Sequence, residues 1–268
     1  MHLIVRKKYL DELIELYGTH DIKVITGIRR SGKSVLLQEF ITYLKSLNEQ
    51  INIVMINLQE LEFDHLLEYH ALHKYIMNQY KEEMTNVLLI DEVQMCPQFE
   101  LAINSIYAKG IYDIYITGSN AKLLSGELAT YLAGRYVEFI VYPFSFAEFL
   151  ELYHSVFPEE TVQKSFQQYI LYGGMPYLAN IRYADEPSRQ YLQDLFNSVQ
   201  LKDIVKRNKI RDVDLLERIM AYVMANVGNT FSASSLAKFL KSEQRTVAPE
   251  TILNYIRYCC DAYLFYPV

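Results

Sequence analysis

Apolar runs of five to eight residues alternate with longer helical patterns through the first half of the chain, and this alternation limits the fold most strongly. The runs that predict strands cover residues 22–26, 51–58, 87–91, 111–117 and 136–141. Helical patterns lie near residues 33–47, 64–83, 98–107 and 121–132. Strands that are apolar throughout and separated by helices are typical of a parallel sheet covered on both faces. We therefore predict one α/β domain over residues 1–145.

The pattern changes near Pro143. Ser145 and Glu148 have the spacing of a capping box, which predicts that a helix begins there. Helical patterns with few strand-like alternations follow to the end of the chain. We therefore predict that the second half is all-helical and forms one or two small units.

The net charge of the chain is −6, from 26 Lys and Arg against 32 Asp and Glu. Residues 1–150 carry 13 basic and 19 acidic side chains (13 − 19 = −6), whereas residues 151–268 carry 13 of each. A net negative protein is not a general binder of phosphate backbones, so a nucleic-acid role requires a local basic patch. Because 51% of the residues are hydrophobic, the chain is not a disordered tail.

No apolar run approaches the roughly 18–20 residues that a membrane span requires, and the N-terminus lacks the order of a signal peptide. We therefore expect a soluble, cytoplasmic protein without a membrane partner. Cys96 stands alone and Cys259 and Cys260 are adjacent, which suits neither a disulfide framework nor a zinc site. The histidines between residues 65 and 73 do not share one helix face, so we predict no metal site there.

A glycine-rich motif carries the strongest indication of function. Gly27, Gly32, Lys33 and Ser34 occupy every fixed position of the pattern G-x-x-x-x-G-K-[ST], between a predicted strand and a predicted helix. In such a loop the backbone N–H groups face phosphate oxygens, the lysine neutralises β- and γ-phosphate charge, and the hydroxyl ligates Mg²⁺. The alternative is a glycine turn before an ordinary helix. The residues expected to contact nucleotide are Gly27, Ile28, Arg29, Arg30, Ser31, Gly32, Lys33, Ser34 and Val35.

Two adjacent carboxylates, Asp91 and Glu92, end the apolar run that begins at residue 87, in the form of a Walker B motif. Ligands of open α/β sheets bind at the carboxyl ends of the strands, so we expect Asp91 to meet the glycine-rich loop there. Asp91 would hold Mg²⁺, and Glu92 would orient and deprotonate an attacking water. The alternative is a pair of solvated acids at a strand end.

Small polar residues end the next apolar run, at Ser119 and Asn120. Either side chain at this position can sense a γ-phosphate or hold the water, and either can equally cap the helix that follows. Arg135 precedes the last predicted strand, where an arginine near the γ-phosphate would stabilise transition-state charge. The alternative for Arg135 is an ordinary surface residue.

The helical half contains three further signals. Pro176 follows two glycines, which indicates either an interhelical turn or a lid contact on the nucleotide base. The basic segment 206–211 either binds phosphate backbones or is a solvated loop. Residues 232–257 resemble a helix-turn-helix, with Arg245 and Arg257 near the reading helix, although such units also bind proteins or cover nucleotides.

These motifs together resemble those of the prokaryotic AAA-type ATPases, close to the STAND and archaeal ATPase group, whose core precedes a C-terminal region of unknown function. The resemblance covers essentially the whole chain. It implies an ASCE-type P-loop NTPase fold over residues 1–145, a helical lid over 146–212 and a winged-helix-like domain over 213–268. Proteins of this type continue into a further domain, so the chain is expected to be truncated where the wing should begin.

The resemblance also implies a role for single residues. It implies ATP binding by Gly32, Lys33 and Ser34, magnesium handling by Asp91 and catalysis by Glu92. It further implies a γ-phosphate sensor at Ser119 or Asn120, an arginine sensor at Arg135 and a contact of Pro176 with adenine.

The expected cofactors are therefore ATP and Mg²⁺, and the expected reaction is hydrolysis of ATP to ADP and phosphate. The favoured output is a nucleotide-dependent switch that acts through a protein partner. The alternative is a nucleic-acid-dependent ATPase that contacts DNA through residues 206–211 and 232–257. A small-molecule kinase is a distant third function.

Overall fold

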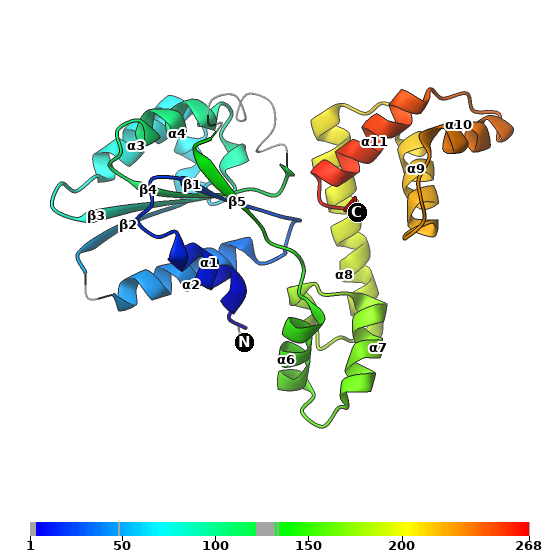
Figure 1. The fold of residues 1–268 in the computed structure, drawn as a ribbon, viewed down its shortest axis with the longest axis horizontal. Coiled ribbons are helices and arrows are strands. Elements are labelled where there is room, and N and C mark those ends of the chain that lie inside the picture. Colours follow the sequence, from blue (N-terminus) through cyan, green and yellow to red (C-terminus); the bar gives the residue numbers. More distant parts are fainter. Residues whose placement is uncertain (1–3, 48, 122–131, 133, 268) are drawn as a thin grey trace. The chain divides into compact units, whose positions relative to one another are not determined.

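The structure is a computed structural model that describes residues 4–47, 49–121, 132 and 134–267 (Figure 1). The chain divides into two compact units, Met1–Tyr191 and Leu192–Val268. The predicted boundaries at residues 145 and 212 differ from this division, because hydrogen bonds tie the first helices after residue 145 to the sheet-bearing part. The N–H of Phe144 donates to the carbonyl of Gly174 at 2.7 Å, for example.

Five parallel strands form the sheet of the first unit, in the order β2-β3-β4-β1-β5. Each predicted apolar run corresponds to one strand, although β3 begins ahead of its run at Thr85, and the predicted α/β fold is confirmed. The bounds are Ile22–Thr26 for β1, Ile51–Asn57 for β2, Thr85–Asp91 for β3, Asp113–Thr117 for β4 and Tyr136–Ile140 for β5. All five residues of β1 are buried because β1 lies between β4 and β5 and is covered on both faces.

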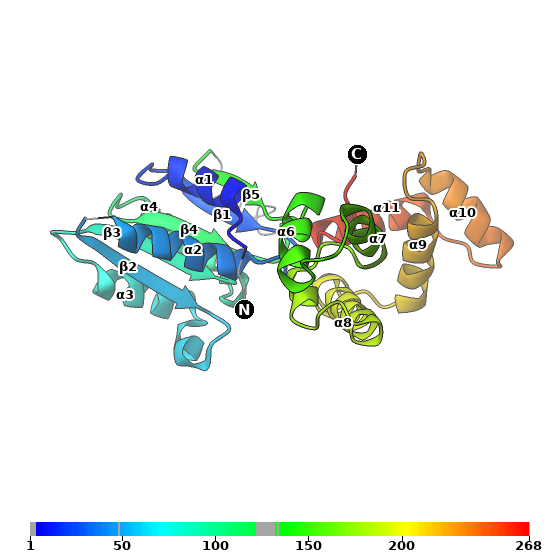
Figure 2. The same cartoon turned by 90° about the horizontal axis from the view of Figure 1, so that it is seen from below.

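Helices cover both faces of the sheet (Figures 1 and 2). The helices α1 (Lys7–Glu15) and α2 (Lys33–Ser46) cover one face, over a core that includes Phe40. The helices α3 (Tyr69–Gln79) and α4 (Phe99–Tyr107) cover the other face, over a core that includes Ile103. Short 3₁₀ helices, η1 (Leu61–Leu66) and η2 (Val93–Met95), follow β2 and β3. Most of the predicted helix over 121–132 lies outside the described residues.

After β5 the first unit continues in helices. These are α6 (Phe146–Val156), α7 (Val162–Tyr172), the 3₁₀ helix η4 (Pro176–Ala179) and α8 (Asp185–Ser198), which runs past the end of the unit. The capping box is present as predicted: Ser145 Oγ accepts from the Glu148 N–H, and Glu148 Oε2 accepts from the Ser145 N–H at 2.8 Å. Aromatic rings, including those of Phe149 and Tyr153, pack α6 against its neighbours.

The second unit is helical over its described residues, as predicted. Its elements are the π-helix η5 (Val199–Lys206), α9 (Val213–Ala225), α10 (Ala233–Ser242) and α11 (Pro249–Asp261). Ile219, Leu236 and Ile252 form the centre of its core. In the described part of the whole chain, every helix is too short or too polar to cross a membrane.

Candidate functional site

The loop between β1 and α2 can form only with glycine at residue 27. Gly27 has φ +137°, and a Cβ there would lie 2.2 Å from the carbonyl oxygen of Val141. The backbone of the loop therefore packs directly against the segment that follows β5. Gly32 then caps α2 with φ +102°, so that the first turn of the helix faces the loop.

Lys33, the first residue of α2, packs against this loop and is 4% exposed. Its Nζ donates to the carbonyls of Gly27 at 2.8 Å and of Ile28 at 3.0 Å. These bonds hold the two ends of the loop around the ammonium group. The ammonium group is thus placed at the N-terminus of α2, where the helix dipole and free N–H groups also favour an anion.

Thr117, a residue that the sequence analysis did not single out, holds both carboxylate residues at the end of β3. Its hydroxyl donates to Asp91 Oδ1 and accepts from the Glu92 N–H at 3.0 Å. Ile90 pairs with Ile116, so Asp91 and Thr117 come next to each other on adjacent strands. Asp91 is 2% exposed, and the hydroxyl of Thr117 fixes its orientation. A threonine at the end of the strand after the Walker B motif is the only signal for this contact in the sequence.

Gln94, which the sequence analysis also missed, contacts the carboxylate of Glu92. Its Nε2 donates to Glu92 Oε2 and, at 3.4 Å, to Ser119 Oγ. The structure thereby brings Glu92 and Ser119 together through one amide. Ser119 and Asn120 are each 1% exposed, so both polar side chains are enclosed at the end of β4.

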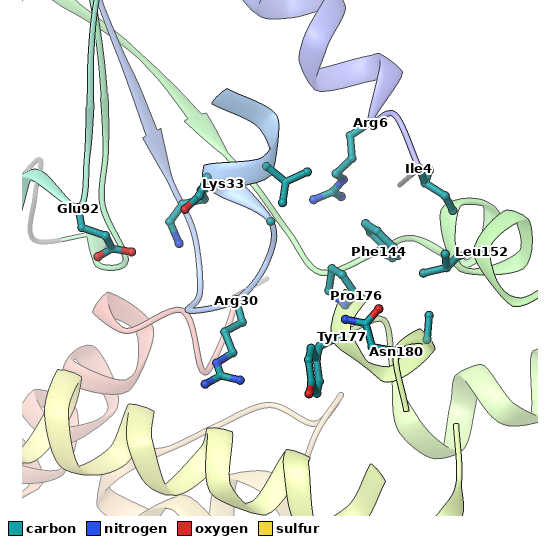
Figure 3. A pocket seen from close by; sticks show the side chains of 14 residues that line it. Ile4, Arg6, Arg30, Lys33, Glu92, Phe144, Leu152, Pro176, Tyr177 and Asn180 are labelled. Atoms are coloured by element: carbon teal, nitrogen blue, oxygen red, sulfur yellow. The ribbon is translucent and has the colours of Figure 1, made fainter. Parts of the chain in front are cut away.

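A cavity of about 290 Å³ opens beside the loop (Figure 3). Figure 3 shows Lys33 and Glu92 across the cavity from Leu152, and Ser34 also lines it. The structure thus brings Pro176 to the same cavity as the loop. The full lining is Ile4, Arg6, Arg30, Gly32, Lys33, Ser34, Val35, Glu92, Phe144, Leu152, Pro176, Tyr177, Ala179 and Asn180.

Close contact between two backbones holds Pro176 at this cavity. A Cβ on Gly174 would lie 2.1 Å from the carbonyl oxygen of Phe144, so only glycine allows the approach. The paired residues also form the hydrogen bond from Phe144 to Gly174. Pro176 then begins η4, which carries Tyr177 and Ala179 to the cavity.

Arg135 does not lie beside the phosphate loop of the same chain, contrary to its expected position near the γ-phosphate. Its carbonyl accepts from the N–H of Ile22, the first residue of β1, so Arg135 lies where the parallel strands begin. The loop and the carboxylates lie at the opposite edge, where the strands end. The guanidinium of Arg135 donates to Asn104 Oδ1 at 2.7 Å and lies 5.5 Å from the ring of Tyr107, both on α4.

In the second unit, α10 and α11 occupy the two predicted helices of the helix-turn-helix. Arg245, between them, forms ion pairs with Asp212 at 3.5 Å and with Asp214. Arg257 donates to Asn254 Oδ1 at 3.1 Å. The positive charge of Arg245 is therefore paired with carboxylates of the same unit.

Comparisons with known proteins agree with this geometry. Residues 19–150 match the family model of an AAA domain, and residues 163–268 match that of a domain of unknown function (DUF8612). An uncharacterized protein of Haemophilus influenzae is 36% identical over 267 residues, which are 98% of this chain and 66% of that protein. An uncharacterized protein of Methanocaldococcus jannaschii is 29% identical over 253 residues, which are 91% of this chain and 56% of that protein.

The solved structures that resemble the chain have lower sequence identity to it than these relatives. The Aeropyrum pernix ORC1 protein, solved in complex with DNA, has a TM-score of 0.48 and 11% identity, over 97% of this chain and 84% of that one. AMPPCP-bound DnaA from Aquifex aeolicus has a TM-score of 0.41 and 15% identity, over 94% and 86%. The family matches over the loop and strands described above show that residues 19–150 form an AAA-type P-loop domain and that residues 163–268 belong to a domain of unknown function.

Proposed function

We propose that the protein binds ATP together with Mg²⁺ and hydrolyses it to ADP and phosphate. One observation carries the proposal: a single cavity is lined by the phosphate loop, with Lys33 and Ser34, and by the carboxylate residue Glu92. A phosphate-binding element and a candidate base therefore face the same space. The apolar part of the cavity lining, with Pro176 and Phe144, offers a surface on which the adenine ring could pack.

Lys33 and the start of α2 would hold the phosphates. On binding, the ammonium group would exchange its bonds to the neutral Gly27 and Ile28 carbonyls for bonds to anionic phosphate oxygens, in which both partners are charged. The remaining residues from Arg29 to Val35 would surround the phosphates and donate backbone N–H groups to their oxygens. Pro176 would contact the adenine ring.

The oxygen donors at the start of α2 and at the end of β3 fit magnesium. Ser34 and Asp91 supply a hydroxyl and a carboxylate, the hard oxygen ligands that Mg²⁺ prefers. Among the described residues, no group of three or more His, Cys, Asp or Glu side chains could hold a metal ion. Mg²⁺ is commonly held by one or two carboxylates plus substrate phosphates, and when bound it neutralises charge between the β- and γ-phosphates.

Glu92 would act as general base. It would accept a proton from the attacking water as the water oxygen bonds to the γ-phosphorus and the bond to the β–γ bridging oxygen breaks. Gln94 supports this role because its amide donates to the carboxylate, and Ser119 supports it indirectly because its hydroxyl accepts from the same amide. Ser119 or Asn120 would sense the γ-phosphate.

The output that we favour is a nucleotide-dependent switch that acts on a protein partner. The net charge of zero over residues 151–268 and the ion pairs of Arg245 support it over DNA binding. The second candidate is a nucleic-acid-dependent ATPase. The helix pair α10–α11 and the basic segment 206–211 favour that candidate.

Calorimetric titration with Mg-ATP tests the site. Lys33→Ala should raise the Kd for ATP by about 10- to 100-fold, because a charged hydrogen-bonding partner is lost. Lys45→Ala is the matched control, since Lys45 lies in the last turn of the same helix. If Lys33→Ala and the parent protein bind ATP with equal affinity, the phosphates of ATP do not bind at Lys33.

Glu92→Gln tests hydrolysis separately from binding. The amide keeps the shape of the side chain but cannot take the proton, so turnover should fall by about 100-fold or more while the Kd stays close to that of the parent protein. Unchanged phosphate release would show that Glu92 is not the base.

ATPase rates with and without duplex DNA, across a salt series, distinguish the two outputs. Binding to a phosphate backbone weakens steeply with salt. DNA stimulation that is lost as salt rises would favour the nucleic-acid candidate, and no stimulation at low salt would exclude it in favour of the switch.

A further inference from the structure

Arg6 is the residue before α1, and its side chain donates hydrogen bonds to three different residues. It is 4% exposed. Its Nε donates to Glu148 Oε1 at 2.8 Å, and its Nη2 donates to Glu148 Oε2 at 3.1 Å. Its Nη1 donates to the carbonyls of Ser31 at 3.2 Å and of Tyr142 at 2.7 Å. Arginine suits this position, because its five N–H donors have a fixed, planar arrangement.

Two aromatic rings complete the surroundings of Arg6. Its guanidinium carbon lies 4.4 Å from the ring centre of Tyr9 and 5.1 Å from that of Phe144. Phe144 also lines the candidate nucleotide cavity, as does Arg6 itself (Figure 3). The guanidinium is therefore both hydrogen-bonded and enclosed at the wall of the site.

The three acceptors belong to three segments that surround the cavity. Ser31 is in the phosphate loop, Tyr142 is in the connection that follows β5, and Glu148 is in the first turn of α6. They lie 25, 136 and 142 residues from Arg6 in the sequence. One side chain thus joins the loop to the part of the chain that carries Phe144 and Leu152 into the cavity.

The contact with Ser31 bears directly on the shape of the phosphate loop. The peptide bond between Ser31 and Gly32 is planar and trans, so the Ser31 carbonyl and the Gly32 N–H point in opposite directions. By holding the carbonyl, Arg6 also sets the direction of that N–H, one of the donors expected to face a phosphate. In the described part of the chain, the Ser31 hydroxyl makes no hydrogen bond that could do this instead.

We propose that Arg6 is a positioning residue for the nucleotide site, which fixes the phosphate loop relative to α6. The inference rests on the proposed ATP binding. The charge of Arg6 is matched by Glu148, so Arg6 acts on the loop and not as a ligand of the phosphates. The segment before α1 is accordingly part of the nucleotide site.

The test compares Arg6→Ala, Arg6→Lys and Glu148→Gln in the full chain, with Lys7→Ala as the matched control because Lys7 is the adjacent, exposed cation. The Kd for ATP is measured by calorimetry, and kcat and KM are measured in the same preparations. Arg6→Ala should raise Kd and KM by about tenfold or more, because the Ser31 carbonyl loses its charged donor and no longer fixes the Gly32 N–H. It should change kcat much less, because the contact of Glu92 with Gln94 is kept. The Kd and KM of Arg6→Lys should lie between those of Arg6→Ala and of the parent protein, since an ammonium group cannot reach all three acceptors together. Lys7→Ala should match the parent protein.

Glu148→Gln separates positioning from direct phosphate binding. If Arg6 positions the loop, weakening its partner loosens the loop and raises Kd. If Arg6 binds phosphate directly, releasing it from Glu148 lowers Kd, and that result would overturn the inference. Circular dichroism checks that each variant is folded, and the milder lysine and glutamine variants remain informative if Arg6→Ala unfolds.

Two outcomes separate this inference from the proposed function. A folded Arg6→Ala protein that binds ATP within twofold of the parent protein would reject the role of Arg6 alone. A parent protein that binds no ATP would instead reject the proposed function on which the inference rests.

Discussion

At the scale of single residues, the site depends on side chains that hydrogen-bond to more than one residue and so connect neighbouring elements. Thr117 uses both the donor and the acceptor capacity of one hydroxyl, on Asp91 and on the Glu92 backbone. Glu92 itself has a left-handed backbone, with φ +53°, which favours glycine and is uncommon for a longer side chain. A hydrogen bond from its N–H to Thr117 supports that conformation.

Thr117→Val tests this arrangement. The valine has the same shape, but it leaves the buried Asp91 carboxylate and the Glu92 N–H without the hydroxyl. Because buried polar groups that lose a partner are costly, the free energy of unfolding should fall by about 1–3 kcal/mol, and kcat should fall with it. Urea denaturation and steady-state ATPase assays measure both, with Thr117→Ser as the control that keeps the hydroxyl. A valine variant with parental stability and kcat would contradict the assigned role of the hydroxyl.

The ionisation of Glu148 gives the second prediction. Burial alone would raise the pKa of Glu148, but hydrogen bonds from Arg6 and Ser145 outweigh it and hold the pKa below the ordinary value of 4.5. A carboxyl whose pKa is lower in the folded than in the unfolded state stabilises the fold above the unfolded pKa. That stabilisation is lost as the pH falls from about 4.5 through the folded pKa.

Glu148→Gln removes this titrating group. The variant should be less stable than the parent protein at pH 7, and the difference should shrink as the pH falls below about 4.5. Urea midpoints at a series of pH values measure the difference. A difference that stays constant down to the lowest pH would show that the charge of Glu148 does not contribute.

At the scale of elements, the cavity is built by backbones that approach closely. The phosphate loop meets the segment after β5 at Gly27, and the turn before η4 meets the same segment at Gly174. Both contacts are to main-chain carbonyls, of Val141 and of Phe144, which cannot move as a flexible side chain can. The segment from Val141 to Phe144 is therefore the part that holds the loop and η4 around one space.

Gly174→Ala tests the contact with η4. The added Cβ would lie 2.1 Å from the Phe144 carbonyl oxygen, so the backbone must shift and Pro176 must move with it. We expect a stability loss of about 1–3 kcal/mol, typical of overpacking, and a higher Kd for ATP. Gly18→Ala is the control for a loss of stability away from the cavity, because Gly18 has φ +77°, which strains an alanine, but does not line the cavity. If both variants bind ATP equally, η4 has no part in nucleotide binding.

At the scale of the whole molecule, the helix α8 links the two compact units through the chain itself, since it runs from Asp185 to Ser198 and the units divide at Tyr191. Arg30 of the phosphate loop lies 5.6 Å from the ring of Tyr191 on this helix. A change in the loop on nucleotide binding can therefore reach α8, and through it the chain that continues into the second unit.

Hydrogen exchange with and without ATP tests this transmission. Ligand at about 100 times its Kd stabilises the state that binds it by about 2.7 kcal/mol, so amides of the phosphate loop and η4 should exchange more slowly. The switch further predicts altered exchange within residues 192–267, and Arg30→Ala should reduce that second change more than the first. Protection confined to the first unit of the parent protein would argue against the switch.

The sequence alone was sufficient where the determining residues are close together. The loop over residues 27–34 follows a local pattern, the Ser145–Glu148 capping box spans one helical turn, and all five apolar runs correspond to strands. These features depend on periodicity, glycine placement and hydrogen bonds between near neighbours, which a reader of the sequence can evaluate directly.

Only the tertiary structure decided which distant residues complete the site. Thr117 reaches Asp91 because β4 pairs with β3 in one register, and Arg6 meets Glu148 across 142 residues of sequence. Arg135 was misplaced because its position in the motif does not reveal that it lies where the strands begin. The physical reason is the same in each case: a local pattern fixes a residue within its own element, whereas a contact between elements depends on strand order, register and packing, which many distant residues set together.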